Sequence, residues 1–229
     1  MQPRIVEVRQ RILKKNDESA RDLRARFASA GTFVVSLVSS PGAGKTTLLR
    51  QTLIHFGKTH RVAALVGDLA TENDAKRLAE SGVPVRQIVT GTVCHLEADM
   101  VATALLGWDL PSLDVLFIEN VGNLVCPASY DLGENLRAVA FSTTEGEDKP
   151  RKYPTIFNTA DVALITKCDL AAAVEFDGAA AHASVQDVRP GMRILEVSAK
   201  TGQGMDEWYR CVHDAMDQRV TSGAAAHAG

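Results

Sequence analysis

A run of small and polar residues early in the chain has the composition of a phosphate-binding loop. It connects an apolar stretch to a segment of helical character and reads Ser39-Ser40-Pro41-Gly42-Ala43-Gly44-Lys45-Thr46-Thr47. Small residues there let successive backbone N–H groups reach phosphate oxygens at the positive end of a helix. Lys45 would place a catalytic cation on the β- and γ-phosphates, and the Thr46 hydroxyl would bind Mg²⁺. The run therefore predicts a nucleoside triphosphate site, although Ser39 replaces the first glycine of the usual pattern.

A second motif, Thr166-Lys167-Cys168-Asp169, follows a predicted strand far down the chain and resembles the Asn-Lys-x-Asp motif of GTP-type nucleoside triphosphatases. The Asp169 carboxylate could accept hydrogen bonds from guanine N1–H and the exocyclic amine, whereas adenine presents an acceptor at N1. The Lys167 stem would cover the base. Thr166 stands where the motif usually has Asn, so the contact by which that Asn would brace this loop against its neighbours is not assigned. After the next strand, a contact to guanine O6 is predicted for Ser198, Ala199 and Lys200. The alternative is an exposed Lys/Asp turn that binds nothing.

Acidic residues at the ends of predicted strands complete the predicted catalytic set. Glu119, with Gly122 three residues on, resembles the Asp-x-x-Gly segment that senses a γ-phosphate. Glu119 would hold Mg²⁺ directly or through water, and the Gly122 N–H would reach the γ-phosphate. Asp68 and Asp74 are candidates for Mg²⁺ coordination or for positioning the attacking water. Each Asp could instead be a helix cap, because Asp commonly sits where a strand gives way to a helix.

Cysteine and histidine residues in two separate segments suit a soft or borderline metal ion. Cys94 and His95 are adjacent, and Cys126 follows soon after Glu119. Thiolate and imidazole ligands favour Zn²⁺ or Ni²⁺, and three ligands per chain leave room for water or for a ligand from a second subunit. Taken singly, each Cys could be a small buried apolar residue and His95 a capping or surface residue. We interpret the two remaining cysteines, Cys168 and Cys211, as packing residues.

The elements that must position these residues alternate between strand and helix. That alternation predicts a doubly wound α/β domain with a mainly parallel sheet of about seven strands. Strands are assigned to residues 33–38, 61–66, 83–89, 113–118, 162–165 and 193–197. Helices are assigned to residues 44–56, 73–80, 95–106, 171–183, with a break at 177–178, and 205–219.

The segments outside this alternation are the two ends of the chain and one internal stretch. Residues 1–30 are interpreted as a helical arm of two short helices interrupted near residues 16–19, residues 31–220 as the nucleotide-binding domain, and residues 221–229 as a disordered tail. The polar stretch 143–150 is interpreted as a surface loop.

Composition excludes several classes of protein. The chain has 229 residues, of which 45% are hydrophobic and 23% charged, and this is typical of a globular domain rather than a disordered or fibrous one. The formal net charge of −3 provides no positive field for sequence-independent binding of nucleic acid. No apolar run approaches a bilayer span and no signal-peptide pattern is present, so we expect a cytoplasmic protein that does not enter a membrane.

Taken together, these segments resemble the hydrogenase-maturation nickel-incorporation GTPases, the HypB family. The resemblance runs from about residue 18 to residue 219, and its most specific part is Ile118-Glu119-Asn120-Val121-Gly122-Asn123-Leu124-Val125-Cys126-Pro127. It implies hydrolysis of GTP to GDP with Mg²⁺. It also implies a nucleotide-dependent homodimer that binds Zn²⁺ or Ni²⁺ at its interface, through residues matching Cys94, His95 and Cys126.

The resemblance also implies partners and a biological role. The role is delivery of nickel to the precursor of the [NiFe] hydrogenase large subunit, with a HypA-type zinc protein as partner. Because no Cys precedes Cys94, we expect no second, tighter nickel site. The alternatives are a urease-maturation GTPase, a cobalamin-enzyme GTPase chaperone and a small-molecule P-loop kinase. The urease-maturation motif separates Cys from His by a Pro, unlike Cys94-His95, and the cobalamin chaperones do not call for the Cys/His set.

Overall fold

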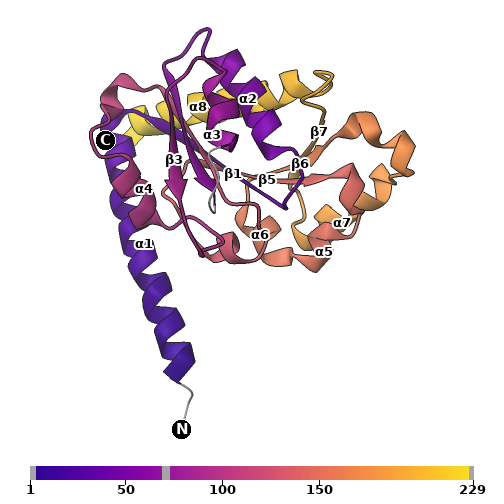
Figure 1. Cartoon of the computed structure of the whole chain (residues 1–229), viewed down its shortest axis with the longest axis horizontal. Coiled ribbons are helices and arrows are strands. Elements are labelled where there is room, and N and C mark those ends of the chain that lie inside the picture. The colour runs from indigo at the N-terminus through magenta and orange to yellow at the C-terminus, as the bar shows by residue number, and fades with distance from the viewer. Residues whose placement is uncertain (1–3, 69–72, 227–229) are drawn as a thin grey trace.

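The structure, a computed structural model, describes residues 4–68 and 73–226 and is built around one seven-stranded sheet (Figure 1). The strand order is β3-β2-β4-β1-β5-β6-β7, and every pairing is parallel. The strands are β1 (Phe33–Ser39), β2 (Val62–Asp68), β3 (Val85–Val89), β4 (Val115–Glu119), β5 (Leu136–Ser142), β6 (Val162–Thr166) and β7 (Arg193–Val197). The predicted doubly wound fold is confirmed.

Helices cover both faces of the sheet, because the central strands are apolar on both sides. Helices α2 (Lys45–Phe56), α3 (Asn73–Ala79) and α8 (Met205–Ala226) pack with Val35 and Leu37 of β1 on one face. On the other face lie α1 (Arg4–Ala30), α4 (Ala98–Ala104), α6 (Pro154–Thr159) and α7 (Gly178–Val188), against Val34 and Val38. The remaining short helices are α5 (Lys149–Lys152), η1 (Leu110–Ser112), η2 (Cys126–Ser129), η3 (Thr143–Glu145), η4 (Cys168–Leu170) and η5 (Ala172–Val174).

The predicted pair of short N-terminal helices is wrong, because α1 is a single helix (Figure 1). The polar residues that suggested a break bond to other elements instead of to their own backbone. Asn16 donates to the Asp131 carbonyl oxygen at 2.9 Å, and Ser19 donates to the Asp99 carboxylate at 2.6 Å. Without competition from these side chains, the helical backbone continues. Within the described residues, no helix has the length and apolar character that crossing a bilayer requires.

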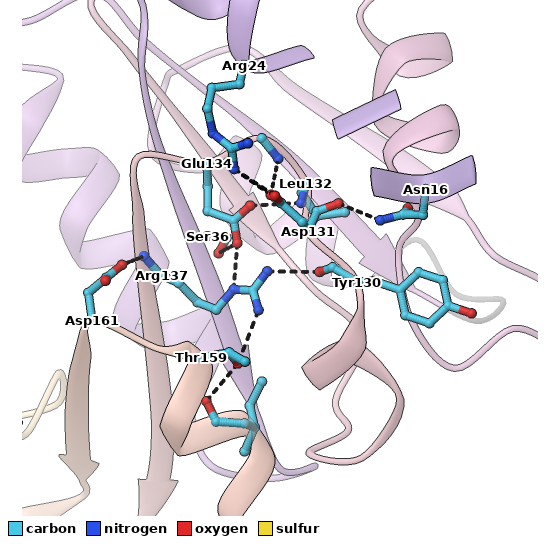
Figure 2. A network of polar contacts seen from close by, with 12 residues as sticks. Asn16, Arg24, Ser36, Tyr130, Asp131, Leu132, Glu134, Arg137, Thr159 and Asp161 are labelled. Carbon is cyan, nitrogen blue, oxygen red and sulfur yellow. Dashed lines mark hydrogen bonds and ion pairs between the residues drawn. The ribbon is translucent and has the colours of Figure 1, made fainter. Parts of the chain in front are cut away.

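Strand β5 is the one strand for which the sequence assignments contain no counterpart. Its second residue, Arg137, breaks an otherwise apolar run, yet that side chain is buried. Figure 2 shows why: the Arg137 guanidinium donates to Glu134 at 2.6 Å, and Glu134 also accepts from Ser36 of β1 at 3.0 Å. A buried charge is tolerated when it is paired and hydrogen-bonded in this way.

Two further predictions differ from the structure. The expected loop at residues 143–150 contains η3. At its start, the Ser142 and Glu145 side chains each accept a hydrogen bond from the backbone N–H of the other residue, which forms a capping box. The first turn is therefore ordered by its own polar groups. Helix α8 reaches Ala226 and not residue 219, so it covers most of the expected tail. Residues 227–229 lie outside the described residues.

Candidate nucleotide and metal site

All seven strands point the same way, so their carboxyl ends meet at one edge of the sheet. The phosphate-binding loop lies there, between Ser39 at the end of β1 and Lys45 at the start of α2. Gly42 and Gly44 have φ values of +78° and +82°, in the left-handed region that residues with a Cβ adopt at a cost. Gly44 is also the N-cap of α2, so the loop ends with backbone N–H groups at the positive end of that helix.

Glu119 ends β4, the neighbour of β1, and its side chain is directed to the phosphate-binding loop. It is 1% exposed. Its Oε1 accepts a hydrogen bond from the Thr46 hydroxyl at 2.8 Å and lies 3.3 Å from the Lys45 ammonium. Burial raises the pKa of the Glu119 carboxyl, and Lys45 and Thr46 act in the opposite direction. Because Oε2 is buried without a hydrogen-bond partner, the group fits a Mg²⁺ site with Thr46.

The other predicted phosphate-side residues lie around this pair. Gly122 passes so close to the loop that an added Cβ would be 3.2 Å from the Pro41 Cα. Asp68 ends β2, the strand next to β4, at the same edge of the sheet. Asp74 lies in the first turn of α3, near enough to raise the pKa of Glu119, and pairs with Arg77 at 3.9 Å. The intervening residues 69–72 are outside the described part of the chain, so the roles of Asp68 and Asp74 stay predictions.

The guanine-motif residues surround a cavity of about 400 Å³ that opens beside the phosphate-binding loop. Asp169 is held in this cavity by Ser198, whose hydroxyl donates to Oδ1 at 2.6 Å. The Lys167 side chain reaches Gly44, since its Cε would lie 3.7 Å from a Cβ added there. Further lining comes from Ala43, Thr47, Ala199 and Lys200. The arrangement leaves room for a base between the β6 and β7 loops, next to residues that could hold its phosphates.

Thr166 supplies the brace between loops that its difference from Asn had left unassigned. Its buried hydroxyl is 2.6 Å from the Ala43 carbonyl oxygen of the phosphate-binding loop and 3.2 Å from the Phe141 carbonyl oxygen of β5. Lys167, the next residue, has φ +57°, and its carbonyl oxygen accepts from the Thr143 hydroxyl at 2.9 Å. The β6 loop is therefore tied to the loops that follow β1 and β5.

The candidate metal ligands Cys94, His95 and Cys126 come together at the same edge. Their ligand atoms all lie within 4.8 Å of one another, and the two Sγ atoms are 2.9 Å apart. In the described residues they form the one group of three or more His, Cys, Asp or Glu side chains with this geometry. Cys94 and Cys126 are 32 positions apart in sequence, so tertiary structure alone joins them. Thiolate and imidazole groups are donors that Zn²⁺ and Ni²⁺ bind, so these three residues are suited to either ion.

The surroundings of His95 keep its imidazole available as a neutral ligand. Burial lowers the pKa of His95, opposed by Glu97, whose carboxylate lies 3.5 Å from Nε2. The imidazole lies against the Tyr130 ring, with 3.9 Å between ring centroids. Neither ring nitrogen has a hydrogen-bond partner although both are buried. Such a pair of unsatisfied nitrogens is what a metal ion, or a ligand bound to one, would satisfy.

Asn120 connects the two halves of the site, and the sequence interpretation assigned it no role. It follows Glu119 and is 1% exposed. Its Oδ1 accepts from the backbone N–H of Leu96 at 3.0 Å and of Val121 at 2.9 Å. Asn120, which follows Glu119, therefore fixes the position of Leu96, which follows His95. In the sequence, the one signal that could have indicated a role for Asn120 is its position in the segment that contains Glu119 and Cys126.

The two remaining cysteines lie apart from this group. Cys211 is buried in the core between α8 and the sheet, in line with its interpretation as a packing residue. Cys168 is half-buried in the loop after β6 and is absent from the core clusters, so packing does not account for it. Burial raises the pKa of both thiols. Neither has the thiolate character that metal binding favours.

With this geometry established, comparison with known proteins gives a consistent result. Residues 33–196 match the family described as CobW/HypB/UreG, nucleotide-binding domain. A relative named Hydrogenase maturation factor HypB, from Azotobacter chroococcum mcd 1, is 49% identical over 221 residues, covering 96% of this chain and 72% of the relative. A protein of the same name from Escherichia coli (strain K12) is 47% identical over 207 residues, covering 90% of this chain and 71% of the relative.

Solved structures agree. The structure of HypB from Helicobacter pylori in complex with nickel superposes with a TM-score of 0.84 at 39% identity and covers 90% of this chain and 96% of that one. The hydrogenase maturation factor HypB from Archaeoglobus fulgidus gives a TM-score of 0.82 at 36% identity, covering 89% and 99%. A LAO/AO transport system kinase, with a TM-score of 0.56 and 20% identity, shares the fold alone.

Proposed function

The chain belongs to the CobW/HypB/UreG family of nucleotide-binding domains, and we therefore propose that it is a GTP-hydrolysing metallochaperone that delivers nickel during [NiFe] hydrogenase maturation. GTP would be the nucleotide, Mg²⁺ its cofactor, and Ni²⁺ or Zn²⁺ the ion bound by Cys94, His95 and Cys126. The nickel bound in the Helicobacter pylori structure supports this choice of ion.

The observation that best supports the proposal is that the candidate metal ligands are connected to Glu119 in two ways, through a shared segment of chain and through the hydrogen bond from Leu96 to Asn120. Glu119 and Cys126 lie on the same stretch after β4, and Asn120 ties that stretch to Leu96, next to His95. A change at the phosphate site therefore has a direct route to the metal ligands. This is the geometry that coupling between GTP and nickel needs.

For the nucleotide, this chain's own residues would divide the work between phosphates and base. Lys45 and the N–H groups of the phosphate-binding loop would hold the phosphates, and Mg²⁺, held by Thr46 and Glu119, would neutralise charge on their oxygens. The Gly122 N–H would meet the γ-phosphate, since Gly122 already approaches Pro41. Asp169 would read guanine while Ser198 fixes its orientation.

We further propose that the working unit is a homodimer in the cytoplasm, with a HypA-type protein and the hydrogenase large subunit precursor as partners. Three protein ligands in one chain leave a metal coordination position for a second subunit. Val125, next to Cys126, is 62% exposed, and a large apolar side chain at such a position is suited to an interface.

The test is the affinity for Ni²⁺ of the GDP-bound protein compared with that of the protein bound to a non-hydrolysable GTP analogue. Coupling predicts a difference of about 5-fold or more, and nickel should change the nucleotide affinity by the same factor. Equal nickel affinities in the two nucleotide states would contradict the proposal. GTP turnover without any phosphate acceptor separates this function from that of a small-molecule kinase.

A further inference from the structure

A buried carboxamide on α1 links two segments of the chain that are distant in sequence. Asn16 lies near the middle of the helix and is 5% exposed. Its Oδ1 accepts from the Ala98 backbone N–H at 2.9 Å, and its Nδ2 donates to the Asp131 carbonyl oxygen at 2.9 Å. Figure 2 shows the second of these bonds. One side chain therefore sets the distance between two backbone positions.

Both of those positions adjoin the candidate metal ligands. Ala98 comes three residues after His95, at the start of α4. Asp131 follows Tyr130, whose ring lies against the His95 imidazole, and the same segment begins at Cys126. Asn16 thus joins the segment that carries Cys94 and His95 to the segment that carries Cys126.

The Asp131 end of this link is firmly anchored. The Arg24 guanidinium donates to both Asp131 carboxylate oxygens at 2.8 Å. The buried Arg137 donates to the Tyr130 carbonyl oxygen at 2.9 Å and to Glu134 at 2.6 Å (Figure 2). Because these bonds tie the segment to α1 and β5, it can serve as the fixed end from which Asn16 positions Ala98.

The Ala98 end depends on Asn16. Glu97, the N-cap residue of α4, makes no side-chain capping bond, so the Asn16 oxygen supplies the acceptor that the first N–H of this helix needs. Two positions earlier, Asn120 holds the Leu96 N–H. The backbone that follows His95 is therefore fixed by one carboxamide from the nucleotide side and one from α1.

We propose that Asn16 is a positioning residue of the metal site, which holds His95 and Cys126 in the relative placement that binds nickel. The proposal rests on the proposed metal site but not on GTP coupling. Residues that orient metal ligands without touching the ion change metal affinity by about 10- to 100-fold when they are replaced. Asn16 lies on α1, outside residues 33–196 that match the family domain. In this proposal the N-terminal helix therefore contributes to the metal site.

The experiment compares nickel binding by three full-length variants, measured by titration and by the nickel–thiolate charge-transfer absorption. Asn16→Leu removes both hydrogen bonds at similar volume. Asn16→Asp keeps the acceptor for Ala98 but places a carboxylate against the Asp131 carbonyl oxygen. Ser19→Ala is the matched control, because Ser19 also joins α1 to α4, through Asp99, without touching the backbone near His95.

We expect Asn16→Leu to weaken nickel binding at least about tenfold, Asn16→Asp to weaken it by more than about threefold but less than Asn16→Leu does, and Ser19→Ala to leave it nearly unchanged. Binding of the GTP analogue should persist in all three and reports that they are folded. If the nickel affinity of Asn16→Leu stays within about threefold of that of Ser19→Ala, the proposal is wrong. Should Asn16→Leu not bind the analogue, Asn16→Asp is judged by the same criterion.

A Cys94→Ala variant measured in parallel separates failure of this inference from failure of the proposed function. Loss of nickel in Cys94→Ala, together with wild-type affinity in both Asn16 variants, removes only the positioning role. Wild-type nickel binding in Cys94→Ala would show that the metal site itself lies elsewhere, and the role of Asn16 would fall with it.

Discussion

At the scale of single residues, the site depends on buried polar atoms whose partners are incomplete. Glu119 Oε2 and both His95 ring nitrogens are buried without hydrogen-bond partners, which is costly in a folded protein that binds nothing. Thr46 and Lys45 contact only the other oxygen of Glu119, Oε1, and the Glu97 carboxylate approaches His95 Nε2 no closer than 3.5 Å. We interpret these unsatisfied atoms as the positions at which the proposed metal ions would bind.

Base selection is a prediction at this same scale. Asp169→Asn should lower GTP affinity by at least about tenfold and improve xanthosine triphosphate binding, because the Asn side-chain N–H would face the exocyclic amine of guanine, which is also a donor, whereas xanthine has a carbonyl acceptor at that position. Competition binding with the two nucleotides measures the change. Ser198→Ala is the control, since it removes the hydroxyl that orients Asp169 but keeps the carboxylate. An unchanged preference for guanine in Asp169→Asn would show that Asp169 does not read the base.

At the scale of elements, the loop between β7 and α8 shows how backbone geometry positions the residues predicted to contact the base. Ser198, Ala199 and Lys200 lie in a tight turn in which the Gly202 N–H bonds to the Ser198 carbonyl oxygen at 2.8 Å. Gly202 and Gly204 have φ values of +87° and +69°. A Cβ added to Gly204 would lie 1.9 Å from the Glu196 carbonyl oxygen, whereas one added to Gly202 would meet nothing within 4 Å.

This pair of glycines gives a matched prediction. Gly202→Ala should cost about 1–2 kcal/mol of unfolding free energy, the ordinary cost of the left-handed backbone for a residue with a Cβ. Gly204→Ala adds a backbone clash, so it should cost more than about 2 kcal/mol and also weaken GTP binding by moving the Ser198 turn. Urea unfolding of both variants measures the difference. Equal costs would mean that the clash with Glu196 relaxes freely.

At the scale of the whole molecule, aromatic rings join α2 to α8 on the face of the sheet that these helices cover. The His55 ring stacks on Tyr209 with 3.8 Å between ring centroids, and the His213 ring stacks on Phe56 at 4.5 Å. The His60 ring lies 5.2 Å from that of His213. Burial lowers the pKa of both His55 and His213, and the neighbouring imidazoles add to this effect.

A pH dependence of stability follows from these lowered pKa values. Lys58 also lowers the pKa of His55, while Asp206 opposes it, and Asp214 and Asp217 oppose the lowering at His213. Because the unfolded chain binds these protons more readily than the folded one, stability should fall as the pH drops below about 6.5, the ordinary imidazole pKa.

Thermal unfolding measured between about pH 7.5 and 5.5 tests this expectation. His213→Phe keeps a ring against Phe56 but removes one titrating group, so its unfolding temperature should fall less over this range than that of the wild-type protein. The same fall in both proteins would show that His213 does not contribute.

The amino-acid sequence alone predicts the local chemistry and the class of fold. The phosphate-binding loop, the Thr166–Asp169 motif and the end of β4 are each contiguous, and the strand–helix alternation requires their loops to meet at one edge of a parallel sheet. Residue types and local spacing suffice for such predictions, because each motif acts through its own backbone turn.

How those pieces are held together depends on contacts that form only when the chain folds. The approach of Cys94 to Cys126, the brace from Thr166 to Ala43 and the bonds of Asn16 and Asn120 all join residues that are distant in sequence. The same reason explains the missed β5 strand and the unbroken α1, because Arg137 of β5 donates to Thr159 of α6 and Ser19 of α1 donates to Asp99 of α4. A polar side chain looks like an interruption until its partner is known, and the fold alone supplies that partner.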